Sequence, residues 1–342
     1  MSDSTSAAPA SDEPTGADGP TIGELGESAT LARVLPRLAP GDSALLGAGD
    51  DAAVVRALDG RFVVTTDLMV HGPDFRLAWS TPFELGWKAA ATNLTDVAAM
   101  GARPTALVVA IAAPPTTPVS LLEGIADGFR EGLARLAPGA GVVGGDLSAS
   151  SVLTIAVTAF GDLEGRAPVL RSGARVGDIV AHAGARGDAA RGLRLLFGEA
   201  TDATGEPDRE RAAAVRARHP ELIAAQLAPS PPVSAGVAAA LAGATAMLDV
   251  SDGLARDARR LAEASGVGLD FDSAALGPDV GIALAGAEDH GLLATFPPYA
   301  ALPAQFDLIG RVVDAAGRLF VDAEPVAAEG WDPYAGWDGR AG

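Results

Sequence analysis

The stretch TPFELGWKAAATNLTDVAAMGA, residues 81–102, predicts a buried helix in the first half of the chain. Thr81 can cap this helix, and Pro82 suits its first turn. Asp96 lies inside the helix, where an Asp lowers helix propensity and has no capping role. Asn93 lies three residues earlier, on the same face. Because the neighbouring residues are small and apolar, the pattern favours a functional carboxylate over a solvated helix face.

Helix and strand patterns alternate on both sides of this helix. In the first half we expect a helix at 31–38, a short apolar strand that ends at Asp67, a strand at 105–113, a helix at 119–136, and strands in GVVGGD and SVLTIAVTAFG. In the second half we expect a strand at 178–183, a helical stretch at 208–227, a strand running into LDVSDGL, a helix at 255–264 and a strand in VGLDFD. Composition changes near Gly165. The sequence therefore predicts an α/β (α+β) fold with a disordered acidic tail at 1–20, an N-terminal domain at 21–165 and a C-terminal domain at 166–342.

The composition excludes several classes of function. The chain has 342 residues, with 25 basic and 44 acidic side chains and a net charge of −19, so nucleic acid is not an expected partner. Cys is absent, which excludes disulfides, thiolate nucleophiles and Cys-ligated zinc. The apolar runs are shorter than the roughly 20 residues of a membrane helix, and the N-terminus lacks the pattern of a secretion signal. We expect a soluble, cytoplasmic protein that does not bind membranes.

Acidic residues gather at five places beside expected strands and turns. Asp50-Asp51 comes before a strand, Asp67 and Asp146 end strands, Asp249 and Asp252 lie around a strand end, and Glu288-Asp289 lies in a Gly-flanked turn. We expect these strand ends to meet at one rim of a sheet. Carboxylates there, together with the hydroxyls of Thr65 and Thr66, would suit Mg²⁺. Taken singly, each acidic site is also explained by turn and cap chemistry, because Asp beside Gly is common in turns.

Other features indicate a phosphorylated ligand. Gly144-Gly145-Asp146 would let the backbone approach a ligand, and Ser251-Asp252-Gly253 precedes a helix whose N-terminal amides suit an anion. Lys88 and Arg171 are the candidate cations for its phosphates. The Walker loop, the dinucleotide-binding Gly motif and the nucleophile elbow of hydrolases are missing, and the four His lack metal-ligand spacing.

The segments GDDAAVV, TTDLMVHGPDF, KAAATNLTDVAAMGA, GGD, RSGARVGD, LDVSDGL, SGVGLDFD and GAEDHGLL together resemble the thiamine-monophosphate kinase family in order and spacing. The resemblance extends from about Gly23 to Tyr334. It implies an N-terminal α/β domain that forms a homodimer through a shared β-barrel, a C-terminal α/β domain, and an active site between the two. It also implies ATP bound through several Mg²⁺ ions, with thiamine monophosphate as the phosphoryl acceptor.

The resemblance implies a role for each of the following residues. Catalysis would depend on Asp67, Asp96 and Asp146. Metal ions would be held by Asp51, Thr65, Thr66, Asp67, Asp96, Asp146, Asp249 and Asp252. ATP would contact Gly145, Asp146, Arg171 and Ser251, and thiamine phosphate would contact Asp74, Glu288 and Trp331. The chain departs from the family pattern where Asp74 stands for a His, where GAEDHG stands for GGEDYE, and where Pro333 stands for a His.

The implied reaction needs no general base. A phosphate monoester has its second pKa near 6, so the attacking oxygen is largely deprotonated at pH 7. Positioning and charge neutralisation can then carry phosphoryl transfer. Two alternatives stay open: an ATP-dependent ring-closing ligase like aminoimidazole ribonucleotide synthetase, and a non-catalytic protein that binds nucleotide or divalent cations.

Overall fold

The computed structural model describes residues 19–39, 41–48 and 52–331 of the chain. The elements of the first half are α1 (Ile22–Leu25), α2 (Glu27–Val34), the 3-10 helix η1 (Leu35–Arg37), β1 (Ala44–Leu46), β2 (Val54–Val55), β3 (Val63–Val70), α3 (Pro82–Ala99), β4 (Arg103–Ala113), α4 (Val119–Leu136), β5 (Gly141–Ala149) and β6 (Thr154–Asp162). Those of the second half are β7 (Ile179–Ala183), α5 (Asp188–Glu199), α6 (Arg209–Arg218), α7 (Pro220–Leu227), α8 (Val233–Leu241), β8 (Ala246–Val250), α9 (Leu254–Ser265), β9 (Gly268–Phe271), α10 (Ser273–Leu276), α11 (Val280–Ala285), β10 (Gly291–Phe296), β11 (Phe306–Val313), β12 (Leu319–Val321) and β13 (Glu324–Val326). Within the described residues, no helix is long and apolar enough to cross a membrane.

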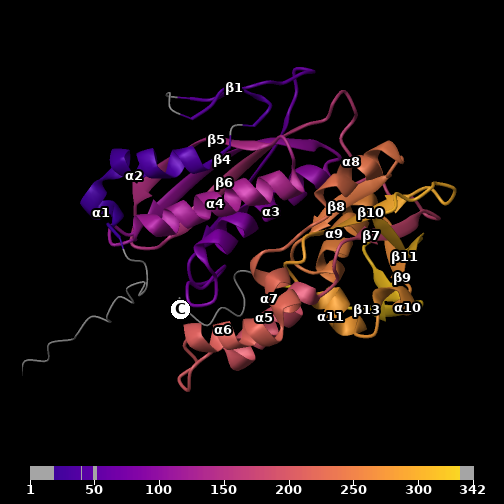
Figure 1. Ribbon diagram of the computed structural model, residues 1–342. Coiled ribbons are helices and arrows are strands. Elements are labelled where there is room, and N and C mark those ends of the chain that lie inside the picture. The colour runs from indigo at the N-terminus through magenta and orange to yellow at the C-terminus, as the bar shows by residue number, and fades with distance from the viewer. Residues whose placement is uncertain (1–18, 40, 49–51, 332–342) are drawn as a thin grey trace, which may run out of the picture.

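The first half is built on a four-stranded sheet with the order β3-β6-β4-β5. β4 and β5 run parallel, and the other neighbours are antiparallel. α3 and α4 pack below this sheet in Figure 1, and the hairpin of β1 and β2 projects on its other side. We call the face turned away from α3 and α4 the open face. β3 and β5 are the two edges of the sheet.

The buried helix α3 begins as its sequence predicts. Thr81 and Glu84 form a capping box, and Pro82 is the first helical residue. Small residues bring α3 and α4 into direct contact: a Cβ on Gly128 of α4 would lie 2.0 Å from the carbonyl oxygen of Phe83. The two helices therefore pack backbone against backbone.

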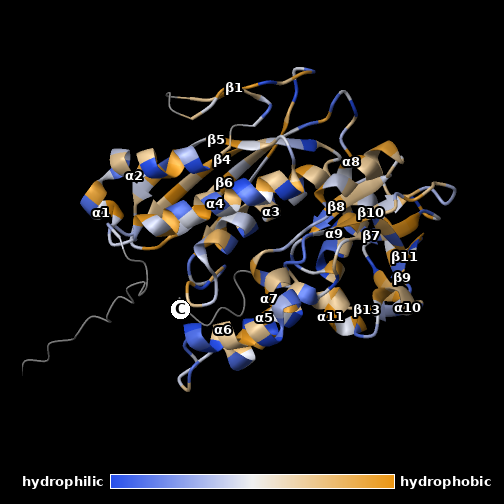
Figure 2. Ribbon diagram, viewed as in Figure 1, coloured by the Kyte–Doolittle hydropathy of each residue, from blue (hydrophilic) through white to orange (hydrophobic). Residues whose placement is uncertain are grey.

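The second half contains a seven-stranded sheet with the order β13-β12-β9-β11-β7-β10-β8. Only the pairing of β12 with β9 is parallel among the strands described there. α5, α6 and α7 form a group at the lower edge of the molecule in Figure 1. Figure 2 shows hydrophilic residues along α6, whereas α8, which contacts both α3 and β10, is largely hydrophobic. α8 thus joins the two halves of the chain.

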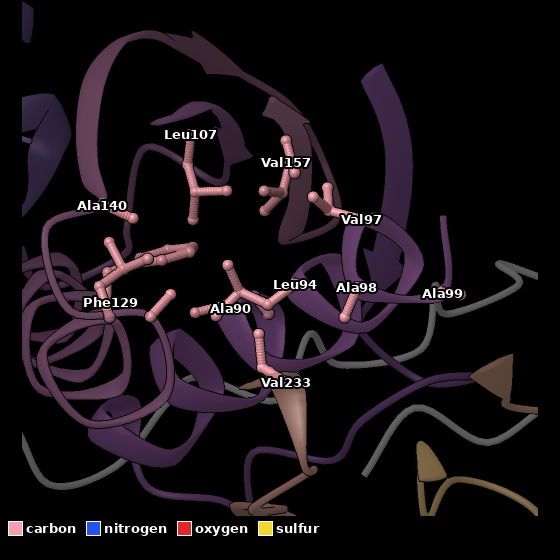
Figure 3. Packing of buried hydrophobic residues seen from close by; sticks show 14 of the residues in the cluster. Ala90, Leu94, Val97, Ala98, Ala99, Leu107, Phe129, Ala140, Val157 and Val233 are labelled. Carbon is pink, nitrogen blue, oxygen red and sulfur yellow. The ribbon is translucent and has the colours of Figure 1, made fainter. Parts of the chain in front are cut away.

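One hydrophobic core extends across both halves. In Figure 3, Leu94 of α3, Phe129 of α4 and Val157 of β6 point into the same cluster as Val233 of α8. The contact between α8 and α3 leaves no room for a side chain, because a Cβ on Gly236 would lie 2.0 Å from the carbonyl oxygen of Ala98. The two sheets are therefore packed against each other through α3 and α8.

Some expected boundaries are wrong. β3 continues past Asp67 to Val70, and β5 continues past Asp146 to Ala149, so neither Asp ends its strand.

The stretch 208–227 forms two helices, because Pro220 cannot continue a helical hydrogen-bond ladder and α6 ends before it. The helix expected at 31–38 also ends early, at Val34, and is followed by a 3-10 turn that contains Pro36. Most of the tail expected at 1–20 lies outside the described residues, and the domain boundary near Gly165 stays a prediction.

Candidate active site

The carboxylate of Asp96 points from α3 toward β3. Thr65 Oγ1 donates a hydrogen bond of 2.8 Å to Asp96 Oδ2. Asp67 lies on the same face of β3 as Thr65, because side chains alternate along a strand. The amide nitrogen of Asn93, three residues before Asp96, donates to the carbonyl oxygen of Ala89 in the same helix at 2.9 Å. The helix and the strand thus form a polar site inside largely apolar packing.

Carboxylates from both halves of the chain act on one another. Burial and the charge of Asp67 raise the pKa of Asp96 to about 6. Burial and the charge of Asp96 raise the pKa of Asp249, in β8, well above its usual value. Burial and the charge of Asp252 raise the pKa of Asp67. We call Asp67, Asp96, Asp249 and Asp252 the carboxylate cluster. Its mutual repulsion would be relieved by a bound cation.

Asp257, in the first turn of α9, supports this cluster and was not singled out in the sequence. It is 1% exposed and accepts the backbone N–H of Asp252 at 2.9 Å. Arg260 donates to Asp257 Oδ1 at 2.5 Å and to Asp252 Oδ2 at 2.7 Å. Burial raises the pKa of Asp257 to about 6. An acidic first turn is common in helices, so only the burial of this side chain marks it as unusual.

Thr66 and Asp146 lie apart from the carboxylate cluster. Thr66 follows Thr65 in β3, so its side chain is on the open face, where Oγ1 donates to the carbonyl oxygen of Val157 at 2.9 Å. Asp146 is in β5, with β6 and β4 between it and β3, and its carboxylate accepts a hydrogen bond of 2.7 Å from Ser148 Oγ. The expected convergence of all the acidic sites at one rim is therefore wrong within a single chain. Asp51 lies outside the described residues.

An apolar cavity of about 500 Å³ lies beside Asp146. Its lining combines side chains of α2, η1 and α4 with β4, β5 and residues 47, 48, 52 and 53. Gly145 is also in the lining, but its lack of a side chain has a structural cause: a Cβ there would lie 1.9 Å from the carbonyl oxygen of Val109 in β4. Gly144 has open space at the corresponding position.

A second cavity, of about 240 Å³, lies where α3, α5 and α7 meet the turn before β10. We call it the acceptor cavity. Asp74, Glu288 and Trp331, which the sequence resemblance assigns to one ligand, all line it. Asp74 accepts the backbone N–H of Val70 at 2.7 Å, and burial raises the pKa of its carboxyl. The backbone N–H of Trp331 donates to the carbonyl oxygen of Asp252 at 2.8 Å, which ties the end of the described chain to the carboxylate cluster.

The guanidinium of Arg76 packs against two aromatic rings of the acceptor cavity, whose centres are 4.9 Å apart. It is 5.1 Å from the ring centre of Trp79 and 5.0 Å from that of Phe197. The indole N–H of Trp79 donates to the carbonyl oxygen of Ala200 at 2.9 Å. The wall of the cavity is therefore aromatic and fixed by contacts between the two halves.

The two acidic residues of GAEDHG have different surroundings. Glu288 lies at the acceptor cavity, and Lys88 Nζ donates to its Oε2 at 3.0 Å. Asp289 is turned away and accepts the backbone N–H groups of Gly187 and Ala189 at the start of α5. Asp289 thus has the structural capping role that the sequence left open for this pair.

Arg171 and Ser251 lie near the carboxylate cluster. The charge of Arg171 lowers the pKa of Asp96, although burial and Asp67 outweigh it. The backbone of Arg171 is held by Ser265 Oγ, which donates to its carbonyl oxygen at 3.0 Å. Ser251 follows β8, and its carbonyl oxygen accepts the backbone N–H of Glu288 at 2.8 Å.

The donors of the carboxylate cluster fit Mg²⁺. Within the described residues, no three His, Cys, Asp or Glu side chains are arranged to hold a metal ion by themselves. Mg²⁺ is usually bound by one or two carboxylates and keeps waters or phosphate oxygens as its other ligands. The cluster, with the hydroxyl of Thr65, suits a cation that arrives with phosphates rather than one enclosed by protein.

Comparison with known proteins identifies the family. The model of the AIR synthase related protein, N-terminal domain, matches residues 49–163. The thiamine-monophosphate kinase of Mycobacterium tuberculosis is 44% identical over 335 residues, covering 94% of this chain and 93% of that protein. The chain belongs to the thiamine-monophosphate kinase family. The thiamine-monophosphate kinase of Corynebacterium glutamicum is 39% identical, covering 93% of this chain and 96% of that protein.

A solved structure supports the same relationship at the level of the fold. AaThiL complexed with AMPPCP and TMP matches with a TM-score of 0.67 and 32% identity, covering 82% of this chain and 90% of that chain. The mixed α/β architecture of this chain is thus shared with that structure.

Proposed function

We propose that this protein transfers the γ-phosphoryl group of ATP to thiamine monophosphate and forms thiamine diphosphate and ADP. The observation that carries the proposal is the position of the carboxylate cluster: Asp67 and Asp96 of the first half face Asp249 of the second, close to the acceptor cavity. The charge of Asp67 also acts on Asp74 in the wall of that cavity. Phosphates held at the cluster would therefore lie beside an acceptor bound in the cavity.

The residues of this chain would act by positioning and charge. The carboxylate cluster and Thr65 would hold Mg²⁺, which supplies charge neutralisation to the phosphates when it is bound. Arg171, near Asp96, would contact the ATP phosphates. Asp74, Glu288 and Trp331 would orient thiamine monophosphate so that its phosphate faces the cluster. No base is required, because the phosphate of the acceptor is largely deprotonated at pH 7.

The nucleotide base would occupy the apolar cavity beside Asp146. Its size and its aliphatic and aromatic lining suit a flat ring, and the catalytic candidate Asp146 lies at its edge. We assign residues 21–165 to ATP and metal binding and to dimerisation, and residues 166–342 to completing the site. We also propose that the protein works in the cytoplasm.

A homodimer would bring the separated parts of the site together. The open face of the four-stranded sheet carries Val64 and Leu68 at 54% and 56% exposure, and these exposed apolar side chains support our proposal that a second copy packs there and closes a β-barrel. Thr66 and Asp146 both lie on this face but at opposite edges of the sheet. We propose that a two-fold partner supplies its Asp146, with the cavity beside it, to the carboxylate cluster of this chain.

Product analysis tests the proposed function. With ATP, Mg²⁺ and thiamine monophosphate, we expect thiamine diphosphate and ADP in equal amounts and no free phosphate. Asp67→Asn should remain folded and form neither product, which would exclude a contaminating kinase. Release of free phosphate without thiamine diphosphate would instead favour a ring-closing ligase.

A further inference from the structure

Glu288 is held in an unusual backbone conformation. Its φ of 70° and the φ of 52° at His290 lie in the left-handed region, which residues other than Gly, Asn and Asp rarely adopt. The backbone N–H of Glu288 donates to Ser251 and that of His290 donates to Val250, both next to the carboxylate cluster. Such strain persists only where the surroundings fix the residue, and it is often found at binding sites.

The side chain of Glu288 is fixed by two donors from different parts of the chain. Lys88 of α3 donates to Oε2 at 3.0 Å, and Gln226 of α7 donates to the same oxygen through Nε2. Lys88 and Gln226 are 4% and 3% exposed, so both donors are buried, whereas the Glu288 side chain is 29% exposed. Within the described residues, the Lys88 ammonium forms its hydrogen bond and its ion pair with Glu288 alone.

The orientation of the Gln226 amide follows from this contact. Burial favours a protonated Glu288, but the charge of Lys88 and the two hydrogen bonds outweigh it and lower the pKa of Glu288. An ionised carboxylate only accepts hydrogen bonds, so Gln226 must present its NH₂ group to it. The amide oxygen of Gln226 is then left buried without a hydrogen-bond partner among the described residues. Burying an unpaired polar atom costs free energy, and the contact with Glu288 has to offset that cost.

Both donors use Oε2 and leave the other oxygen of Glu288 available. Oε1 has no partner among the described residues, and Glu288 lines the acceptor cavity. We propose that Lys88 and Gln226 are positioning residues that clamp Glu288 so that its ionised Oε1 faces the acceptor. This inference rests on the proposed function and adds two specificity-determining residues to it. The cationic thiazolium and the amino group of thiamine monophosphate are the kinds of group that a fixed carboxylate oxygen binds.

A double-mutant cycle tests the clamp. We expect Lys88→Met and Glu288→Gln each to weaken calorimetric binding of thiamine monophosphate, and to raise its KM, by about tenfold to a hundredfold, with little change in the KM for ATP. Because Lys88 acts through Glu288, the double variant should bind about as weakly as either single variant. Gln226→Leu should weaken acceptor binding in the same direction, and Lys88→Arg should restore most of it.

Arg216→Met is the matched control. Arg216 of α6 donates to the carboxylate of Glu84 of α3 and to the backbone carbonyl oxygen of Trp79, and so also joins the two halves. Neither Arg216 nor Glu84 lines the acceptor cavity, and Arg216 contacts Trp79, which does line it, only through the backbone. It should leave acceptor affinity nearly unchanged while lowering the melting temperature. Losses that multiply in the double variant, or an equal loss of acceptor affinity in Arg216→Met, would overturn the clamp. A wild-type protein that binds thiamine monophosphate but forms no thiamine diphosphate would instead overturn the proposed function. The clamp would still be tested in that case, because the double-mutant cycle is measured by binding and does not need turnover.

Discussion

Asp96 makes the stability of the metal-free protein depend on pH. Burial and the charge of Asp67 raise its pKa in the folded chain from 3.8 to about 6. Between these values the folded state binds more protons than the unfolded state. The stability contributed by this group is therefore present below the unfolded pKa and is lost as the pH rises through the folded pKa.

Replacing Asp96 by Asn should remove this loss. We expect Asp96→Asn to raise the melting temperature of the metal-free protein more at pH 8 than at pH 5.5, because the wild-type carboxylate is charged and repelled at the higher pH. Thr65 can still donate to the amide oxygen of the new side chain. Thermal unfolding in a chelating buffer measures the effect, and an equal shift at both pH values would contradict it. Turnover should be lost at either pH.

The sequence predicts single site residues where local context is unusual. Asp96 stands out because a carboxylate inside a small, apolar helix has no local explanation, and the structure places it against Thr65 and in the carboxylate cluster. Asp257 gives no such signal, because an acidic residue in a first helical turn is ordinary. Its role in holding the turn at Asp252 depends on tertiary burial, which a single sequence does not contain.

At the level of elements, the close contact of α3 with α4 depends on a glycine, which has no side chain, at the point of contact. Gly128 and Gly132 lie one turn apart on α4, but only Gly128 meets the backbone of α3 closely: a Cβ on Gly132 would be 3.5 Å from its nearest neighbours, an ordinary contact. The two positions therefore form a matched pair for mutation.

Gly128→Ala should be strongly destabilising and Gly132→Ala should not. We expect Gly128→Ala to lower the free energy of unfolding by about 1–3 kcal/mol or more, because α3 and α4 must separate to admit the methyl group. Gly132→Ala should be neutral or stabilising by up to about 1 kcal/mol, since Ala has the higher helix propensity. Urea unfolding measures both, and similar values for the two variants would contradict the backbone contact.

The sequence predicts where helices and strands lie along the chain better than it predicts which of them contact each other in the fold. The helices at 82–99 and 119–136 are predicted closely, because caps and apolar periodicity are local. The strand ends at Asp67 and Asp146 are misplaced, because carboxylates suggest turns even where a strand continues. Sheet order decides which acidic residues meet, and it depends on pairing between distant segments. The sequence alone therefore could not predict that Asp146 and Asp67 lie at opposite edges of the sheet.

At the level of the whole molecule, a shared site between two copies can be tested by complementation. Asp67→Asn and Asp146→Asn should each be inactive as homodimers. If a partner supplies Asp146, a mixed dimer contains one intact site, and random exchange should restore about a quarter of the wild-type activity. Co-refolding the two variants and measuring thiamine diphosphate gives the result. No recovery in verified mixed dimers would place both residues in one chain's site.

The open face should control assembly. We expect Leu68→Asp to produce a folded monomer, because a charge would be buried in the contact between two copies. Leu241→Asp is the control, since Leu241 is 71% exposed on α8, in the other half of the chain. Light scattering coupled to size exclusion distinguishes the two. A Leu68→Asp protein that still forms dimers would move the interface elsewhere.

The contact of Gly236 with Ala98 limits how this chain can be recombined with its relatives. α8 follows the proposed boundary near Gly165, yet its backbone rests on α3, which precedes that boundary. A chimera that takes residues 1–165 from one relative and the rest from another would combine an α3 and an α8 from different proteins. Their surfaces would not have evolved together for a close backbone contact. α3 and α8 should therefore be taken from the same parent protein in any chimera. This holds although 133 residues separate Pro82–Ala99 from Val233–Leu241 (233 − 99 − 1 = 133).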